Sequence, residues 1–156
     1  MLSIDTLVPG FNRALGAIPG GRETVRILEE STGEESTLSP RTAALVRVAV
    51  AQRVGHPYAR WAMGRIAERQ RVSAEDIFLA TAGTARDRVE DLVLKSSMRM
   101  ASSGRNSQPS EFELLSHLMG EQRATEVVAQ VAMAMLACEA LGAIAPATGA
   151  ASKKGA

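Results

Sequence analysis

The segment from Ser39 to Gly55 constrains the fold of this chain more than any other part of the sequence. It begins with Ser39-Pro40, where the serine can cap a helix and the proline suits the first helical position. Its interior is apolar on nearly every face except at Arg47, and Gly55 is a typical helix terminator. Because a helix that is apolar all round must be surrounded by other elements, the segment predicts a central, buried helix.

The neighbours of this helix are also expected to be helices. Aromatic residues make up 3% of the 156 residues, so small and aliphatic side chains must fill the core, a composition that favours helices. No segment alternates with the period of a strand. Start and stop signals predict further helices over 57–69, 87–102, 110–118 and 121–141. Ser73 is expected to cap one more helix, and a capping box at Ser110 opens the helix over 110–118. We expect an all-α, compact bundle of seven or eight helices, as one domain over 1–145, with a disordered tail over 146–156.

Charge and hydropathy exclude several classes of partner. The 18 Lys+Arg and 17 Asp+Glu residues give a net charge of +1, and Lys153 and Lys154 lie in the tail, so a footprint for nucleic acid or anionic lipid is not expected. The N-terminus does not resemble a secretory signal, and no window approaches the roughly 20 apolar residues of a membrane span. The Ala-rich run over 127–144 indicates a buried core helix instead. We therefore expect a soluble, cytoplasmic protein that binds neither nucleic acid nor membrane.

The block from Leu38 to Ile77 has a layout of helices that resembles a known family. It reads LSPRTAALVRVAVAQRVGHPYARWAMGRIAERQRVSAEDI. A Leu-Ser-Pro-Arg start opens a buried Ala/Val helix, a short break precedes a Pro-Tyr start, Ala67 fills a small-residue position, and a Val-Ser-x-Glu-Asp-Ile box opens the next helix. This layout is similar to the core of the alkylhydroperoxidase D-like / carboxymuconolactone decarboxylase-like superfamily, over roughly residues 38–143. The resemblance implies that all-α fold and a homo-oligomer, a trimer or a multiple of one.

The reacting groups of that family are absent here. In its peroxidase branch the second helix begins Cys-x-x-Cys-x-x-x-His and the preceding helix carries a Glu. The matching residues are His56, Ala59, Met63 and Ala44 in this chain. Hydroperoxide reduction by this family needs a thiolate and a resolving thiol. The decarboxylase branch has histidines where Tyr58 and Met63 stand, so the resemblance implies the fold but neither of the two activities.

Polar groups nevertheless remain at the start of the helix predicted over 57–69. His56 and Tyr58 are the candidate catalytic residues, because a neutral imidazole there could act as a general base and a phenol could stabilise an enolate or carboxylate. The simpler interpretation is that His56 caps the helix or binds a local carbonyl. The candidate ligand-binding residues are Arg47, Arg60, Trp61 and Met63.

These ligand-binding candidates have alternative roles. Arg60 or Arg47 could grip an acidic ligand, but most arginines of this region are expected on a solvated face, and Arg47 lies either at a helix edge or paired in the interior. Trp61 could line a pocket, although a subunit contact is the favoured interpretation. Met63 is expected to fill the core.

Sulfur and metal chemistry is not expected. Cys138 is the only cysteine and lies in an apolar helix, which predicts a small buried side chain. One cysteine and two histidines, His56 and His117, have no ligand spacing, so we predict no metal site and no cofactor.

The sequence leaves two functions open and does not decide whether the protein is an enzyme. The first is a non-redox member of this fold that acts on or binds a small acidic or carbonyl-bearing molecule, without thiol peroxidase activity. The alternative is a catalytically silent oligomeric scaffold or partner-binding protein. A thiol peroxidase that uses Cys138 across a subunit interface is disfavoured, because the apolar surroundings offer no base to activate the thiol.

Overall fold

The computed structural model describes residues 36–103 and 109–144, together with positions 17, 19, 20, 23 and 26. This part of the chain contains helices and no strand, which confirms the all-α prediction for it. Its helices are α4 (Pro40–Val54), α5 (Pro57–Arg69), α6 (Ala74–Thr81), α7 (Arg88–Ser103), α8 (Pro109–Met119) and α9 (Glu121–Ile144). The described residues thus hold six helices where the sequence predicted seven or eight for the chain. The predicted tail over 146–156 lies outside the described residues.

Local chemistry sets most of the helix ends. Ser39 and Ser73 cap α4 and α6 as predicted: each Oγ accepts a hydrogen bond from the backbone N–H three residues later, at 3.0 and 3.1 Å. Gly55 ends α4 with a φ of 90°, which glycine adopts without steric cost. The capping box predicted at Ser110 is wrong, because α8 already begins at Pro109.

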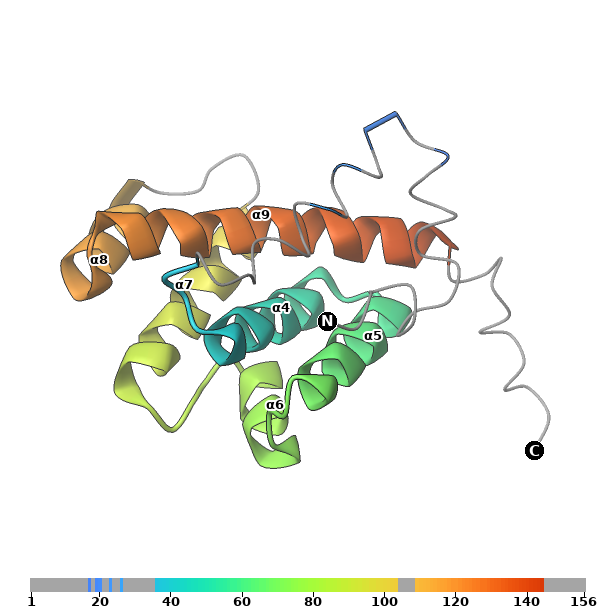
Figure 1. The fold of residues 1–156 in the computed structure, drawn as a ribbon, viewed down its shortest axis with the longest axis horizontal. Coiled ribbons are helices and arrows are strands. Elements are labelled where there is room, and N and C mark those ends of the chain that lie inside the picture. The colour runs from blue at the N-terminus through green and yellow to red at the C-terminus, as the bar shows by residue number, and fades with distance from the viewer. Residues whose placement is uncertain are drawn as a thin grey trace.

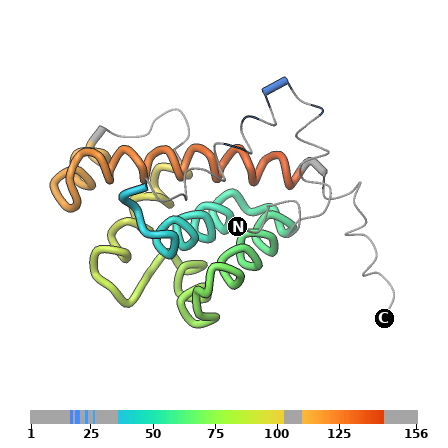
Figure 2. The backbone as a smooth tube through the Cα atoms, viewed as in Figure 1, coloured from blue at the N-terminus to red at the C-terminus, as the bar shows by residue number. Residues whose placement is uncertain are grey.

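The central position predicted for α4 is confirmed. The helix packs against α5, α6, α7 and α9, and every residue from Ala43 to Ala51 is buried. Figure 1 shows α9 running beside α4 along the length of the molecule, with α8 folded back against the start of α9. The same path is visible in the tube of Figure 2, where α4 and α9 run in the same direction. Each face of α4 therefore has a neighbouring helix.

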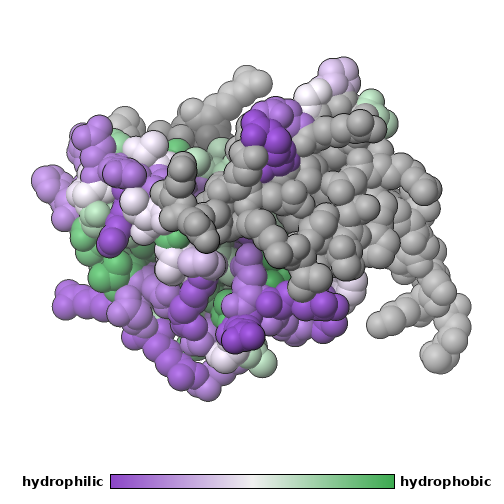
Figure 3. All heavy atoms as spheres, viewed as in Figure 1, coloured by the Kyte–Doolittle hydropathy of each residue, from purple (hydrophilic) through white to green (hydrophobic). Residues whose placement is uncertain are grey.

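The core is aliphatic, as the composition predicted. Its largest fully buried side chains include Leu45, Leu94, Leu115 and Leu141. Aromatic side chains in the described residues lie at the surface or are half-buried instead: Tyr58, Trp61, Phe78 and Phe112. On the face drawn in Figure 3, the described surface is mostly hydrophilic, with small hydrophobic areas between the polar side chains.

The helix α9 is more apolar than the sequence analysis expected. By length and composition alone, its segment Glu121–Gly142 could cross a membrane, so the expectation that no window approaches this limit is wrong. Within the apolar 18-residue window of that segment 44% of the residues are buried, and α9 packs against α4, α5, α7 and α8. The core helix of a soluble protein has the same character, because it too is apolar on most sides.

One carboxylate of α9 fixes where the chain enters α4. Glu126 Oε2 accepts hydrogen bonds from the Leu38 backbone N–H at 3.0 Å and from Ser36 Oγ at 2.8 Å. The other oxygen accepts from Thr37 Oγ1 at 2.8 Å. These bonds join the residues that precede α4 to the first turns of α9, so they set the register between the two helices.

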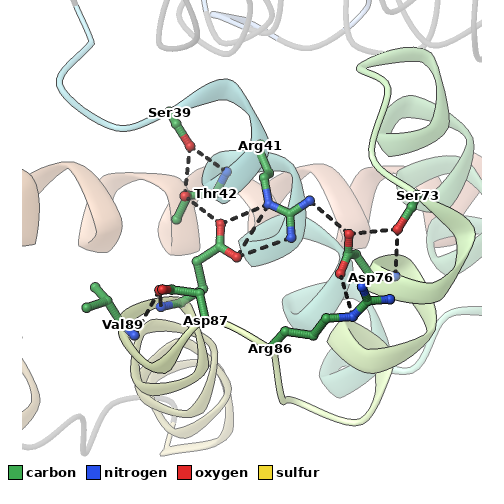
Figure 4. Close-up of polar contacts among 9 residues, drawn as sticks. Ser39, Arg41, Thr42, Ser73, Asp76, Arg86, Asp87 and Val89 are labelled. Carbon is green, nitrogen blue, oxygen red and sulfur yellow. Dashed lines mark hydrogen bonds and ion pairs between the residues drawn. The ribbon is translucent and has the colours of Figure 1, made fainter.

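At its other side, the start of α4 is tied to α6 and α7 through one guanidinium. Arg41 donates from Nη1 to Asp76 Oδ2 at 2.9 Å and from Nε to Glu90 Oε1 at 3.2 Å (Figure 4). Asp76 also accepts from Ser73 Oγ at 2.7 Å, and Arg86 Nε lies 3.7 Å from its second oxygen. The hydrogen bonds from Arg41 and then Ser73 lower the pKa of Asp76 to about 2.

This lowered pKa predicts a pH-dependent stability. The ordinary value is 3.8, so the Asp76 carboxylate stabilises the folded chain above that pH, and its contribution is lost as the pH falls toward 2. Asp76→Asn should reduce the free energy of unfolding by about 1–2 kcal/mol at neutral pH. The difference from the unmodified protein should shrink between about pH 4 and pH 2. Urea unfolding followed by circular dichroism measures it.

The control for this experiment is Glu113→Gln, which removes an exposed carboxylate of α8. It should change the unfolding free energy little at any pH. A stability difference for Asp76→Asn that stays constant across the acid range would contradict the lowered pKa of Asp76.

Candidate functional site

His56 lies at the junction of α4 and α5, in the N-cap position of α5. Its ring makes no cap hydrogen bond, so the capping role considered from the sequence is not observed. Instead Nε2 lies 3.3 Å from Oε2 of Glu139 on α9. The ring also lies against Gly142, where an added Cβ would be 2.6 Å from its Cγ and Cδ2. The absence of a side chain at Gly142 therefore gives the imidazole room beside α9.

The His56–Glu139 pair has the composition of an acid–base site. When the neutral ring donates its Nε2 hydrogen to Glu139, the lone pair at Nδ1 is available to accept a proton. The carboxylate then stabilises the imidazolium that forms, as an orienting carboxylate does in hydrolytic triads. The side chains of His56 and Glu139 are 39% and 69% exposed, so both are accessible from solvent. The arrangement can transfer protons, and at this exposure it is not a water-excluded pocket.

The other candidates on the first turns of α5 form a separate group beside this pair. The rings of Tyr58 and Trp61 are stacked, with centroids 5.6 Å apart and an angle of 14° between their planes. Trp61 is 51% exposed, while Tyr58 packs partly against the core. The exposed Arg60 reaches Gln52 Oε1 at 3.5 Å, the long limit for a hydrogen bond. Among the described residues, none of the three hydrogen-bonds to the His56 ring.

The other three positions that the sequence resemblance matched to reacting groups hold hydrocarbon side chains. Ala44, Ala59 and Met63 are 2%, 0% and 5% exposed and belong to one aliphatic core. Met63 thus fills the core, which is the alternative role considered for it, and it does not line a site that solvent can reach. No nucleophile or base of the kind the family uses is present at these three positions.

Cys138 is buried in the same core, as predicted. It is fully enclosed, and burial together with the nearby charge of Glu139 raises the pKa of its thiol to about 12. At neutral pH the thiolate fraction is then about one part in 10⁵. Because the thiolate is the reactive form, Cys138 has the character of a packing residue.

Arg47 lies inside the bundle and away from His56. Only 6% of its surface is exposed, and its Nε donates to Gln130 Oε1 of α9 at 3.1 Å. The buried Nη2 has no hydrogen-bond partner among the described residues. Desolvation lowers the pKa of Arg47 to about 10, so the guanidinium stays charged at neutral pH. The sequence left two interpretations of Arg47 open, a place at a helix edge or a pair in the interior. In the structure Arg47 is in the interior and is paired with the neutral amide of Gln130.

The two partners on α9, Gln130 and Glu139, were not predicted from the sequence. Gln130 and Glu139 were treated only as interruptions of an Ala-rich run. A polar residue in an otherwise apolar helix is a signal for a specific partner, because a buried polar group needs a hydrogen bond. That signal could have selected Gln130, while the exposed Glu139 needed the packing of α5 against α9 to be known.

Neither metal ligands nor known relatives add to this assignment. In the residues that the structure describes, no group of three or more His, Cys, Asp or Glu side chains could hold a metal ion. No protein-family model, curated protein or solved structure matches the chain. The resemblance to the alkylhydroperoxidase D-like superfamily therefore depends on the sequence layout and stays a prediction.

The close approach of His56 to α9 predicts different effects for two helical glycines. An added methyl group meets nothing within 4 Å at Gly64, and Gly64→Ala should stabilise α5 by about 0.5–1 kcal/mol. Gly142→Ala should lose this gain, because the new Cβ must displace the His56 ring. Thermal unfolding and the NMR resonance of the His56 Cε1 proton measure the two effects. The close packing of His56 against Gly142 is contradicted if Gly142→Ala stabilises the protein as much as Gly64→Ala and leaves the His56 resonance in place.

Proposed function

We propose that this protein is a non-redox member of the alkylhydroperoxidase D-like / carboxymuconolactone decarboxylase-like fold that acts on or binds a small acidic or carbonyl-bearing molecule at His56. The observation that carries the proposal is the pair formed by His56 and Glu139. It brings an imidazole from the α4–α5 junction and a carboxylate from α9 together at a place that a small molecule can reach.

The chemistry that suits this pair is a proton transfer next to a carbonyl group. His56 Nδ1 accepts a proton from the carbon beside the carbonyl, and the electron pair of that C–H bond moves to the carbonyl oxygen as an enolate. Glu139 stabilises the imidazolium, and the Tyr58 hydroxyl or Arg60 is the candidate donor to the enolate oxygen. In a β,γ-unsaturated carbonyl compound the resulting dienolate takes the proton back at its γ-carbon, which moves the double bond into conjugation with the carbonyl group, so no oxidant or reductant is consumed.

The surroundings of the pair support a reaction without sulfur chemistry. The only cysteine is enclosed, and its raised pKa keeps the thiol protonated. Residues that would form a thiol relay in the family's peroxidases are replaced by core alanines and a methionine. A thiol peroxidase mechanism has no accessible nucleophile in the described residues.

A catalytically silent, oligomeric scaffold is the second candidate function. The observation that favours it is the closed aliphatic packing at Ala44, Ala59 and Met63, where the family keeps its reacting groups. Large apolar side chains are exposed elsewhere and suit contacts with further copies of the chain or with a partner: they include Trp61, Phe78 and Leu136. We propose a homo-oligomer, a trimer or a multiple of one, which sedimentation of the full chain tests.

The acid–base proposal predicts a dependence on one of the two histidines. A panel of small keto acids and unsaturated lactones is incubated with the protein in D₂O, and deuterium uptake at carbon is followed by NMR. His56→Ala should reduce uptake by roughly 10²–10⁴-fold, the usual contribution of a general base. Glu139→Gln should have a smaller effect, because the ring keeps its base but loses the stabilising charge.

His117→Ala is the matched control, since it removes the exposed histidine of α8. It should leave uptake unchanged. Uptake that is equal in His56→Ala and the unmodified protein would exclude the proposed role, as would a panel in which no compound exchanges.

The enclosed thiol predicts an absence of peroxidase activity. An organic hydroperoxide supplied with a dithiol reductant should be consumed no faster than in buffer, and Cys138→Ala should behave identically. A thiol-specific reagent should label Cys138 only after unfolding, because the thiol is both buried and protonated. Hydroperoxide turnover that Cys138→Ala abolishes would contradict the non-redox proposal.

A further inference from the structure

Arg47 is a buried charge that the proposed reaction does not use. Its side chain is enclosed in the middle of α4, within a run of nine consecutive buried residues. Its interaction within the described residues is the single bond from Nε to Gln130 Oε1. An amide oxygen carries a dipole and no net charge, so no described residue that bonds to the guanidinium neutralises it.

The cost of such an arrangement is high. A buried ion is stable in a protein interior only with an opposite charge and with hydrogen bonds for its remaining donors. The enclosed Nη2 of Arg47 carries two N–H donors that have no acceptor in the described residues. Within the part of the chain that the structure describes, the guanidinium therefore lacks both a negative charge and a hydrogen-bond acceptor, and a single carboxylate would supply both.

We propose that Arg47, held by Gln130, is a binding site for a small monocarboxylate with an apolar body, located between α4 and α9. The site is distinct from His56 and does not rest on the function proposed there. Gln130 and Glu139 are nine residues apart on α9, which places them about 13 Å apart along the helix and half a turn apart around it.

The geometry of the bond to Gln130 selects the class of ligand. Because Nε is occupied, the edge formed by Nη1 and Nη2 is left, and this edge matches the two oxygens of a carboxylate in parallel hydrogen bonds. One guanidinium compensates one negative charge, which disfavours phosphate and other polyvalent anions. The guanidinium lies in an aliphatic core, so an apolar body is favoured over a polar one.

Benzoate is a suitable probe, with benzamide as its uncharged isostere. Titration calorimetry of the full chain at constant ionic strength should show saturable binding of benzoate and none of benzamide. Arg47→Met keeps an unbranched, flexible side chain but removes the charge, and should weaken benzoate binding at least about tenfold. Arg69→Met, which removes an exposed arginine at the end of α5, is the matched control and should bind as the unmodified protein does.

Two further measurements keep the test decisive. If Arg47→Met does not fold, the Nε–H resonances of the arginines in the unmodified protein should still show one side chain that shifts and saturates with benzoate. His56→Ala should retain benzoate binding, which separates this site from the acid–base proposal. The inference is overturned if benzoate does not saturate the protein, if benzamide binds equally, or if Arg47→Met binds undiminished. If benzoate does not bind and Arg47→Met is destabilised, the inference is also overturned. The charge that compensates Arg47 then comes from a carboxylate of this chain or of a second copy.

Discussion

The enclosure of α4 on every side is the constraint on which the rest of the structure depends. Because every residue from Ala43 to Ala51 is buried, no face of the helix is left for water, and four other helices must cover it. Alanines on α4 allow those helices to approach closely, and the aliphatic core needs no aromatic side chain to fill it. The same enclosure has a consequence for charge: a polar side chain in this stretch cannot reach the surface, so Arg47 must be accommodated inside.

Two arginines on the same helix show how position decides the role of a charge. Arg41 is at the start of α4, where it is 42% exposed and reaches carboxylates on α6 and α7, so it joins helices at little cost. Arg47 lies six residues later, and among the described residues its hydrogen-bond partner is a neutral amide. An uncompensated buried ion costs several kcal/mol, a large part of the 5–15 kcal/mol by which a domain is normally stable. Arg41 is therefore explained by the fold alone, whereas Arg47 is not.

How much of this could be predicted from the sequence depends on the range of each interaction. The ends of α4 and α6 follow from Ser39, Gly55 and Ser73, because a cap involves neighbours in the chain. At α8 two local signals compete, and the proline at position 109 starts the helix ahead of the serine that follows. The two partners on α9 are each 83 residues from the side chains they contact. Such pairs depend on how helices pack, which no local pattern specifies.

The pairs Arg47–Gln130 and His56–Glu139 have the same separation in sequence, but they lie in different environments. α4 and α9 run in the same direction (Figure 1), and Glu126 fixes their register at the start, so residues nine apart on one chain segment meet residues nine apart on the other. Nine residues are two and a half helical turns, so Gln130 and Glu139 lie on opposite sides of α9, one buried and one exposed. An enclosed guanidinium interacts strongly with an anion because little water screens it. An exposed imidazole–carboxylate pair can instead exchange its proton with solvent. The same helix packing therefore places an enclosed charge at one position and an exposed imidazole–carboxylate pair at the other.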